Sequence, residues 1–281
     1  MQIIIGVSEI IKARKSIKQN LKIGFVPTMG ALHQGHIALV KRSVKENDIT
    51  IVSIFVNPKQ FNDKADLINY PRNIENDLDL LEKAKCNIVF MPDNEDIYNN
   101  YQGYQTDLKG IDKIYEGEFR PGHFQGVVDV VYRLFDLVKP HKAYFGEKDF
   151  QQLAIIKLMT KNANLPIEVI ACEIVREKSG LAMSSRNERL SDEQKTVSAK
   201  IYKTMLKHTK NLKPNQKTQE IIQKIKEEID NTAFLKTEYI VFCEQESLKP
   251  VYTLAKNTDV KLCLAVWCEK IRLIDNISLH I

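Results

Sequence analysis

Two histidines separated by a glutamine and a glycine follow a short apolar run near the start of the chain. The run FVPTMGALHQGH, residues 25–36, contains the spacing H-x-G-H, and its histidines are His33 and His36. We predict that a buried strand ends before Met29 and that a helix begins near Gly35. Both imidazoles would then lie on one side of the helix start, beside free N–H groups and the positive end of the helix dipole. This arrangement is typical of a polyphosphate-binding site.

The two glycines of this run would let a phosphate approach the backbone, because neither carries a Cβ atom. A plainer interpretation is a glycine turn followed by two surface histidines, and it would suffice for either histidine alone. The spacing H-x-G-H directly after a strand is much rarer, so we favour the phosphate site.

A second polar run, FGEKDFQQ at residues 145–152, follows another predicted strand. Gly146 would permit a ligand to approach closely, and Lys148 would supply a positive charge for phosphate oxygens. Asp149 could accept a hydrogen bond from a ribose hydroxyl, or it could cap the helix that follows. Taken alone, Glu147, Lys148 and Asp149 are equally well explained as a solvated charged turn.

Three further segments carry polar side chains that could join the same chemistry. The loop GLAMSSRN, residues 180–187, has paired serines and Arg186, which suit a loop that clamps phosphates, although serine-rich loops are common. Gln60 follows a predicted strand, so we expect it at the same end of the sheet as the histidines. Arg120 could pair with a ligand carboxylate or form a structural ion pair.

The composition is that of a globular protein, with 43% hydrophobic and 27% charged residues. The apolar runs are far shorter than the roughly 20 residues that cross a bilayer, so we expect no membrane insertion. The N-terminus has no basic region before its apolar residues, which argues against a secretory signal. Five scattered cysteines without a C-x-x-C pair predict reduced thiols and a cytoplasmic location. The formal charge of +5 is too small to indicate a nucleic-acid partner.

Strands and helices alternate in the first part of the chain, which indicates an α/β domain with a parallel sheet. The clearest amphipathic helix covers residues 124–138. The predicted strands cover residues 22–27, 49–56, 88–91, 142–146 and 166–172. Further predicted helices follow His36 and cover residues 73–85 and 150–163. Ligands of such sheets bind beyond the carboxyl ends of the strands, where the polar runs lie.

The pattern changes after about residue 176. Ser191 and Gln194 form a capping-box signature before a helix, Pro214 ends that helix, and a second helix carries residues 221–229. Strand-like runs follow at residues 239–243, 260–267 and 270–274. Two helices followed by strands indicate a smaller α+β domain. We therefore predict one domain over residues 1–176 and a smaller lid domain over residues 177–281, with the loop 173–190 at the boundary.

Taken together, these runs resemble the pantothenate synthetase (pantoate–β-alanine ligase) family of the H-x-G-H nucleotidylyl transferase superfamily. Six ordered blocks carry the resemblance and are more specific than any one of them. They are FVPTMGALHQGH at 25–36, FVNPKQF at 55–61, YPR at 70–72, RPGHFQGV at 120–127, FGEKDFQQL at 145–153 and GLAMSSRN at 180–187.

The resemblance implies a Rossmann-like first domain and an ATP-dependent ligase that works in two steps. The carboxylate of (R)-pantoate would attack the α-phosphate of ATP in the presence of Mg²⁺, giving pantoyl adenylate and pyrophosphate. The amine of β-alanine would then attack the acyl carbon, giving pantothenate and AMP. The resemblance also implies a homodimer.

The resemblance further assigns roles to individual residues. His36 matches the position described as a proton donor, and His33, Lys148 and Arg186 are predicted to act with it. Gln60 would contact pantoate and β-alanine, Gln152 would hold pantoate, and Asp77 is the predicted metal ligand. The implied ATP contacts are Met29, Gly30, Ala31, Leu32, His33, Gln34, Gly35, His36, Gly146, Glu147, Lys148, Asp149, Val175, Met183, Ser184, Ser185 and Arg186.

Several positions depart from the family pattern, namely Ala65, Asp66, Asn73, Asn76, Asp129 and Ser179. Two other functions stay open. A nucleotidylyltransferase that stops after AMP transfer would share the H-x-G-H segment but would not need Gln60 and Gln152. A non-catalytic nucleotide- or RNA-binding module would be expected to show a basic stripe, which this chain lacks.

Overall fold

The computed structural model describes all residues from 1 to 281, and the chain divides into two compact units. Unit 1 comprises residues 1–147 and 151–173, and unit 2 comprises residues 148–150 and 174–281. The sequence-based boundary was set between residues 176 and 177, whereas this division falls between residues 173 and 174. The short segment 148–150 groups with unit 2. None of the helices combines the length and the apolar character needed to cross a membrane.

Unit 1 is built on a six-stranded sheet in which every pair of neighbouring strands is parallel, in the order β1-β4-β3-β2-β5-β6. The strands are β1 (Gln2–Ile4), β2 (Ile23–Thr28), β3 (Ile49–Ile54), β4 (Ile88–Phe90), β5 (Lys142–Gly146) and β6 (Glu168–Cys172). This sheet confirms the predicted Rossmann-like α/β class. β1 was not predicted, because three residues are too few to give a periodic signal.

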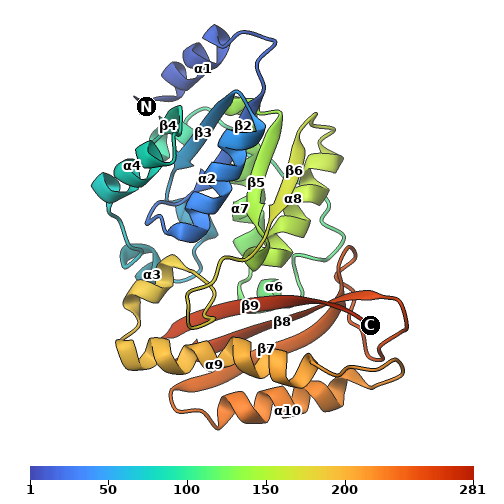
Figure 1. Ribbon diagram of the computed structural model, residues 1–281. Helices are drawn as coiled ribbons and strands as arrows, with labels where there is room; N and C mark the ends of the chain where they lie inside the picture. The colour runs from blue at the N-terminus through green and yellow to red at the C-terminus, as the bar shows by residue number, and fades with distance from the viewer. The chain divides into compact units, whose positions relative to one another are not determined.

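Helices lie on both sides of this sheet (Figure 1). The longer ones are α1 (Val7–Ser16), α2 (Gln34–Glu46), α4 (Ile74–Lys83), α7 (His123–Val138) and α8 (Phe150–Asn162). The short ones are η1 (Pro58–Gln60), α3 (Lys64–Ile68), α5 (Asn94–Tyr98), α6 (Glu116–Phe119) and η2 (Glu147–Asp149). Successive strand residues face opposite layers, since Phe25 packs with the α1, α7 and α8 core whereas Val26 packs with the α2 and α4 core.

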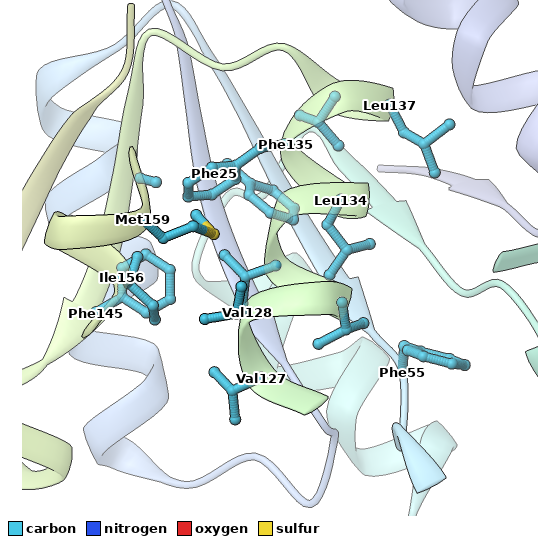
Figure 2. Close-up of a cluster of buried hydrophobic side chains, with 14 of the residues drawn as sticks. Phe25, Phe55, Val127, Val128, Leu134, Phe135, Leu137, Phe145, Ile156 and Met159 are labelled. Carbon is cyan, nitrogen blue, oxygen red and sulfur yellow. The ribbon is translucent and has the colours of Figure 1, made fainter. Parts of the chain in front are cut away.

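The core between the sheet and α7 is dominated by large apolar side chains (Figure 2). The ring of Phe135 lies edge-on to Phe25 from β2 and to Phe145 from β5, with 6.3 Å between the centroids in each pair. Val127, Val128 and Leu134 of the same helix are buried there too. The predicted amphipathic helix is thus confirmed as α7. Its packing against the sheet holds its N-terminal end, which begins at His123, in place.

The direction in which successive strands are placed in the sheet reverses at β2. From β2 the chain continues to β3 and β4 on one side, whereas β5 and β6 lie on the other side. The β2–β5 pair is therefore a switch point, where connections run to opposite sides, and ligands of open α/β sheets bind beyond the carboxyl ends of the strands at such points. The β2–α2 loop follows β2, and Gly146 is the last residue of β5. The topology therefore brings two predicted ligand-binding segments of unit 1 to one sheet edge.

Unit 2 contains a three-stranded antiparallel sheet, in the order β7-β8-β9, with two helices beside it (Figure 1). Its elements are η3 (Ser185–Arg189), α9 (Asp192–Thr209), α10 (Thr218–Asp230), β7 (Leu235–Glu244), β8 (Asp259–Cys268) and β9 (Ile271–His280). The predicted capping box is present, because the N–H of Gln194 donates to Ser191 Oγ and the N–H of Ser191 donates to Gln194 Oε1.

β9 is longer than the predicted run 270–274. Asp275 and Asn276 interrupt its apolar pattern, yet both side chains are buried. Two guanidinium nitrogens of Arg176 donate to the two oxygens of Asp275, at 2.6 and 2.8 Å. Because this charge is paired, the strand can bury it. Here the charged residue within the strand is explained by its ion pair with Arg176, and it does not mark the end of the strand.

Glu46, at the end of α2, provides a test of acid stability. Its carboxylate accepts hydrogen bonds from Arg42, Lys142 and Tyr144. The bond from Arg42 lowers the pKa of Glu46 most, burial opposes the shift, and the pKa falls from 4.5 to about 2. The charged form therefore stabilises the fold above pH 4.5, and this contribution is lost as the pH falls from 4.5 towards 2.

We predict that Glu46→Gln lowers the free energy of unfolding at pH 7 by about 1 kcal/mol, since the ion pair is solvent-accessible and screened. Urea unfolding at a series of pH values measures this difference. It should shrink as the pH approaches 2. A difference that stays constant down to that pH would contradict the assignment of the stabilisation to the ionised carboxylate.

Candidate active site

The β2–α2 loop presents two half-buried imidazoles at the start of α2. His33 is the N-cap residue, and its Nδ1 accepts a hydrogen bond from the N–H of Gly35 at 3.1 Å. His36 lies in the first turn, and its Nδ1 accepts from the N–H of His33 at 3.4 Å. The ring centroids are 4.1 Å apart. The loop thus holds the two rings side by side, as the H-x-G-H spacing predicts.

These contacts determine which ring nitrogen carries the proton. A backbone N–H can only donate, so the Nδ1 atoms of His33 and His36 must be acceptors and carry no hydrogen. The proton of each neutral imidazole is therefore on Nε2. Both rings are fixed as hydrogen-bond donors through Nε2, which suits them to anionic oxygens.

The backbone N–H groups of this loop have acceptors within the protein. The N–H of Gly30 donates to Thr28 Oγ1 at 3.2 Å, and that of Gly35 donates to His33. The N–H groups of Ala31 and Leu32 donate to the carboxylate of Asp77, at 2.9 and 2.6 Å. We expected free N–H groups for a phosphate, but these four are engaged. These four backbone groups are therefore not the phosphate donors that the sequence predicted.

Asp77, the predicted metal ligand, lies in the first turn of α4 and is only 1% exposed. Burial raises the pKa of its carboxyl, while the bonds from the N–H groups of Leu32 and Ala31 act in the opposite direction. Both of its oxygens face N–H donors. The chain also holds no group of three or more His, Cys, Asp or Glu side chains that could bind a metal ion. Because Asp77 is almost fully buried and each of its oxygens already accepts from an N–H group, its carboxylate does not suit a magnesium site, which needs oxygens open to a hydrated ion.

Gln60 lies at the end of η1, after β3, and its side chain meets the β2–α2 loop. Its Nε2 donates to Met29 Sδ at 2.9 Å, which brings two sequence-predicted site residues together. Its Oε1 accepts from Asn57 Nδ2 at 3.2 Å. Asn57 Nδ2 also donates to the carbonyl of Gly126, and its Oδ1 accepts from Tyr98 Oη at 2.7 Å.

This network fixes the orientation of the Gln60 amide. The N–H of Lys59 donates to Asn57 Oδ1 at 3.1 Å, so that atom must be the oxygen of the Asn57 amide. Asn57 therefore presents its NH₂ group to Gln60, which must accept with Oε1. The Nε2 group of Gln60 is left as the donor on the side of Met29, where a carboxylate or hydroxyl oxygen could accept from it.

The backbone around Gln60 is held by the start of α7. His123 Nδ1 lies 2.7 Å from the carbonyl oxygen of Gln60, and Arg120 donates to His123 Nε2 at 3.0 Å. Arg120 also donates to the same carbonyl at 3.4 Å. A Cβ atom at Gly126 would lie 2.3 Å from the carbonyl oxygen of Lys59, so glycine lets the helix pack directly on the turn.

The β5–α8 segment contributes residues to both units. Gly146 and Glu147 belong to unit 1, and a Cβ atom at Gly146 would meet nothing within 4 Å. Gln152, the predicted pantoate ligand, is half-buried on α8. Its neighbour Gln151 is buried and donates to the carbonyls of Ile111 and Ile114, both at 2.7 Å. The two adjacent glutamines therefore differ, and Gln151 has a structural role.

The remaining predicted residues lie in unit 2. Lys148 is 3.9 Å from Asp149, and its carbonyl accepts from Asn276 Nδ2 at 3.0 Å. The N–H of Met183 donates to the carbonyl of Val175, which pairs two predicted ATP contacts that are eight positions apart. Ser184 caps η3 by accepting from the N–H of Arg186, while Ser185 is buried.

Three departures from the family pattern have structural explanations. Asn73 caps α4, because its side chain accepts from the N–H of Asn76 at 3.1 Å. Ser179 accepts from the N–H of Leu181 at 3.4 Å. The carboxylate of Asp129 accepts from Lys59 Nζ and from the N–H of Tyr104, both at 2.9 Å. Asn76 itself is exposed, and nothing in the structure explains that substitution.

Several residues of this network were not identified from the sequence, namely Asn57, Tyr98, His123, Gly126 and Gln151. Asn57 directly before a proline is a turn signal, and that signal could have indicated its capping role. The contributions of Tyr98 and His123 depend on contacts between segments far apart in the chain.

Comparisons with known proteins agree on one family. The sequence profile described as pantoate-beta-alanine ligase matches residues 2–278. A pantothenate synthetase of Bacteroides fragilis is 45% identical over 260 residues, which are 92% of each chain. The crystal structure of pantothenate synthetase from Thermus thermophilus superimposes with a TM-score of 0.89, at 36% identity and over 99% of both chains.

A second similar structure was solved with ligands. It is the pantoate-beta-alanine ligase of Francisella tularensis, described as complexed with beta-gamma ATP and beta-alanine. It superimposes with a TM-score of 0.82 at 36% identity, over 99% of this chain and 97% of that one.

The close approach at Gly126 generates a prediction. Gly126→Ala would place a methyl group against backbone atoms of Lys59 and Gln60 that cannot rotate away. We expect a loss of about 1–3 kcal/mol in the free energy of unfolding and a displaced Gln60 amide. Chemical denaturation measures the first effect, and the KM for pantoate measures the second.

Asp136→Ala is the matched control, because Asp136 is on the same helix and its side chain is 55% exposed. This variant should leave the KM for pantoate unchanged. An unchanged KM for pantoate in Gly126→Ala would show that the turn does not position Gln60 for the substrate.

Proposed function

The chain belongs to the pantoate–β-alanine ligase family, and from this premise we propose that it condenses (R)-pantoate with β-alanine through a pantoyl-adenylate intermediate. The observation that carries the proposal is the pair of imidazoles, His33 and His36, fixed as Nε2 donors at the start of α2. They follow β2, at the switch point of the parallel sheet, where ligands of such folds bind.

In the first step, the pantoate carboxylate attacks the α-phosphate of ATP, a bond forms between carboxylate oxygen and phosphorus, and pyrophosphate leaves. The carboxylate is already ionised at neutral pH, so no strong base is needed. The step requires alignment and stabilisation of the charge that develops on pyrophosphate. The Nε2–H groups of His33 and His36 are suited to this task. Mg²⁺ enters with ATP as part of the substrate.

Gln60 is proposed to orient the pantoate. Its oxygen is held by Asn57 and its Nε2 donates to Met29 Sδ, so the orientation of the amide is fixed with its NH₂ group as the donor, which can also serve a substrate oxygen. We assign Gln152 to the same substrate on the sequence match. In the second step, the amine of β-alanine attacks the acyl carbon, and AMP leaves with the electron pair of the broken C–O bond.

Lys148 and Arg186 are assigned to the triphosphate by the sequence match alone. Ammonium and guanidinium groups are the usual partners of transferring phosphoryl groups. The same match assigns Gly146, Glu147, Asp149, Val175, Met183, Ser184 and Ser185 to ATP. A homodimer and a cytoplasmic location are likewise proposals drawn from the sequence.

The direct test of the activity is product analysis. We expect pantothenate, AMP and pyrophosphate in equal amounts when the purified chain is incubated with pantoate, β-alanine, ATP and Mg²⁺. Chromatography of the nucleotides distinguishes AMP from ADP. ADP as co-product would contradict adenylation, and AMP transfer to a phosphorylated acceptor without pantothenate would favour a nucleotidylyltransferase.

The role of His36 is tested by two substitutions. His36→Ala removes the Nε2 donor, and we expect adenylate formation in a single turnover to fall about a hundredfold, close to 3 kcal/mol, with the fold intact. His36→Asn keeps an acceptor near the position of Nδ1 but supplies no donor at Nε2, so it should show a similar loss.

Lys41→Ala, at an exposed position of α2, is the control and should react at the rate of the unsubstituted chain. If His36→Asn retained full activity, the Nδ1 contact and not the Nε2 donor would be the functional feature of this histidine.

A further inference from the structure

The carboxylate of Asp77 occupies a concave turn of backbone in the β2–α2 loop. Its Oδ2 accepts from the N–H of Ala31 at 2.9 Å, and its Oδ1 accepts from the N–H of Leu32 at 2.6 Å. Successive N–H groups that converge on one point form an anion-binding concavity, which in many proteins holds a phosphate. Here the anion in that concavity belongs to the protein itself.

The loop adopts an uncommon conformation to make these bonds. Gly30 and Ala31 both have left-handed backbone conformations, with φ of +78° and +49°. Alanine rarely adopts this conformation, because its Cβ crowds the backbone. A Cβ atom at Gly30 would lie 3.0 Å from Asp77 Oδ2 and 3.1 Å from Ile54. The chain closes tightly over the carboxylate at this point, and the two hydrogen bonds compensate for the strain at Ala31.

The next residues along the chain are those that the proposed reaction uses. Leu32, held by Asp77, precedes His33, the N-cap of α2. His33 and His36 are in turn connected by the N–H contacts that fix their tautomers. A loop that lost its anchor at Leu32 would therefore move the start of α2 and both imidazoles together.

We propose that Asp77 is a positioning residue, which holds the β2–α2 loop so that His33 and His36 meet the triphosphate, and that it is not a magnesium ligand. The inference rests on the proposed function and deepens it. Each oxygen of Asp77 accepts from an N–H group and the side chain is only 1% exposed, so its remaining lone pairs are not open to a hydrated magnesium ion. Magnesium then reaches the site with ATP, without a ligand from this aspartate.

The test compares Asp77→Asn with Asp79→Asn, an exposed aspartate on the same helix whose side chain is 54% exposed. In Asp77→Asn, the NH₂ group of the side chain replaces one carboxylate oxygen and must face the N–H of Ala31 or Leu32. Two donors cannot bond to each other, so one of the two hydrogen bonds is lost. We expect the Kd for ATP to rise and the single-turnover rate to fall. The ratio of that rate to the Kd should fall about ten- to a hundredfold. The KM for pantoate and the midpoint of the free Mg²⁺ titration should stay unchanged, and Asp79→Asn should match the unsubstituted chain.

Gly30→Ala provides a second variant that disturbs the same loop and leaves the carboxylate in place. It should reproduce the pattern of Asp77→Asn, with ATP binding weakened and the Mg²⁺ midpoint unchanged. A Mg²⁺ midpoint that shifted tenfold or more in Asp77→Asn, but not in Gly30→Ala, would identify Asp77 as a metal ligand. Unaltered ATP binding and rate in Asp77→Asn would equally overturn the proposal.

A measurement on the unsubstituted chain covers the case in which Asp77→Asn does not fold. Mn²⁺ is titrated with and without ATP and followed by electron paramagnetic resonance. We expect no Mn²⁺ binding without nucleotide in the range where the Mn²⁺–ATP complex binds. Binding of Mn²⁺ alone in that range would count against the proposal. ATP binding by calorimetry needs no ligase turnover, so failure of pantothenate formation would overturn the function without deciding the role of Asp77.

Discussion

The pairing of the Asp77 carboxylate with the N–H groups of Ala31 and Leu32 is the interaction on which the candidate site depends. The connection between β2 and α2 must turn sharply, and a backbone that turns in the left-handed region has N–H groups that no helix or strand can satisfy. Asp77, from a helix that begins more than forty residues later, supplies the acceptor. The positions of both imidazoles follow from that contact.

A second chain of hydrogen bonds gives the other side of the site its orientation. It begins with the N–H of Lys59, which cannot act as an acceptor, and passes through Asn57 to Gln60. The orientation of each side-chain amide in this chain of hydrogen bonds is determined, because the backbone N–H at its start can only donate. The glycine at position 126 brings α7 close enough for its carbonyl to join this network.

The sequence alone predicted the alternating strands and helices of unit 1, because their apolar periodicity is strong and the fully buried central strands are short and β-branched. It also predicted that H-x-G-H would lie after β2, since glycine and histidine there follow a clear strand. It did not predict that Asp77 contacts the β2–α2 loop or that Arg176 pairs with Asp275 of β9. The family match implies a metal role for Asp77, and a sequence does not show that this carboxylate meets two backbone N–H groups from a distant segment. The extent of β9 was missed for the same reason, as Arg176 makes the burial of Asp275 possible only in three dimensions.

The order of strands in the sheet has a consequence for how the chain acquires its shape. β2 and β5 are neighbours, and a bond between Ile23 and His141 joins residues 118 positions apart. During synthesis, the β2–α2 loop therefore leaves the ribosome long before β5, the strand that pairs with β2. Pairing across such a separation carries a large loop-closure cost and slows folding. A partly synthesised chain would expose the edge of β2, and that interval is when chaperone protection would matter most.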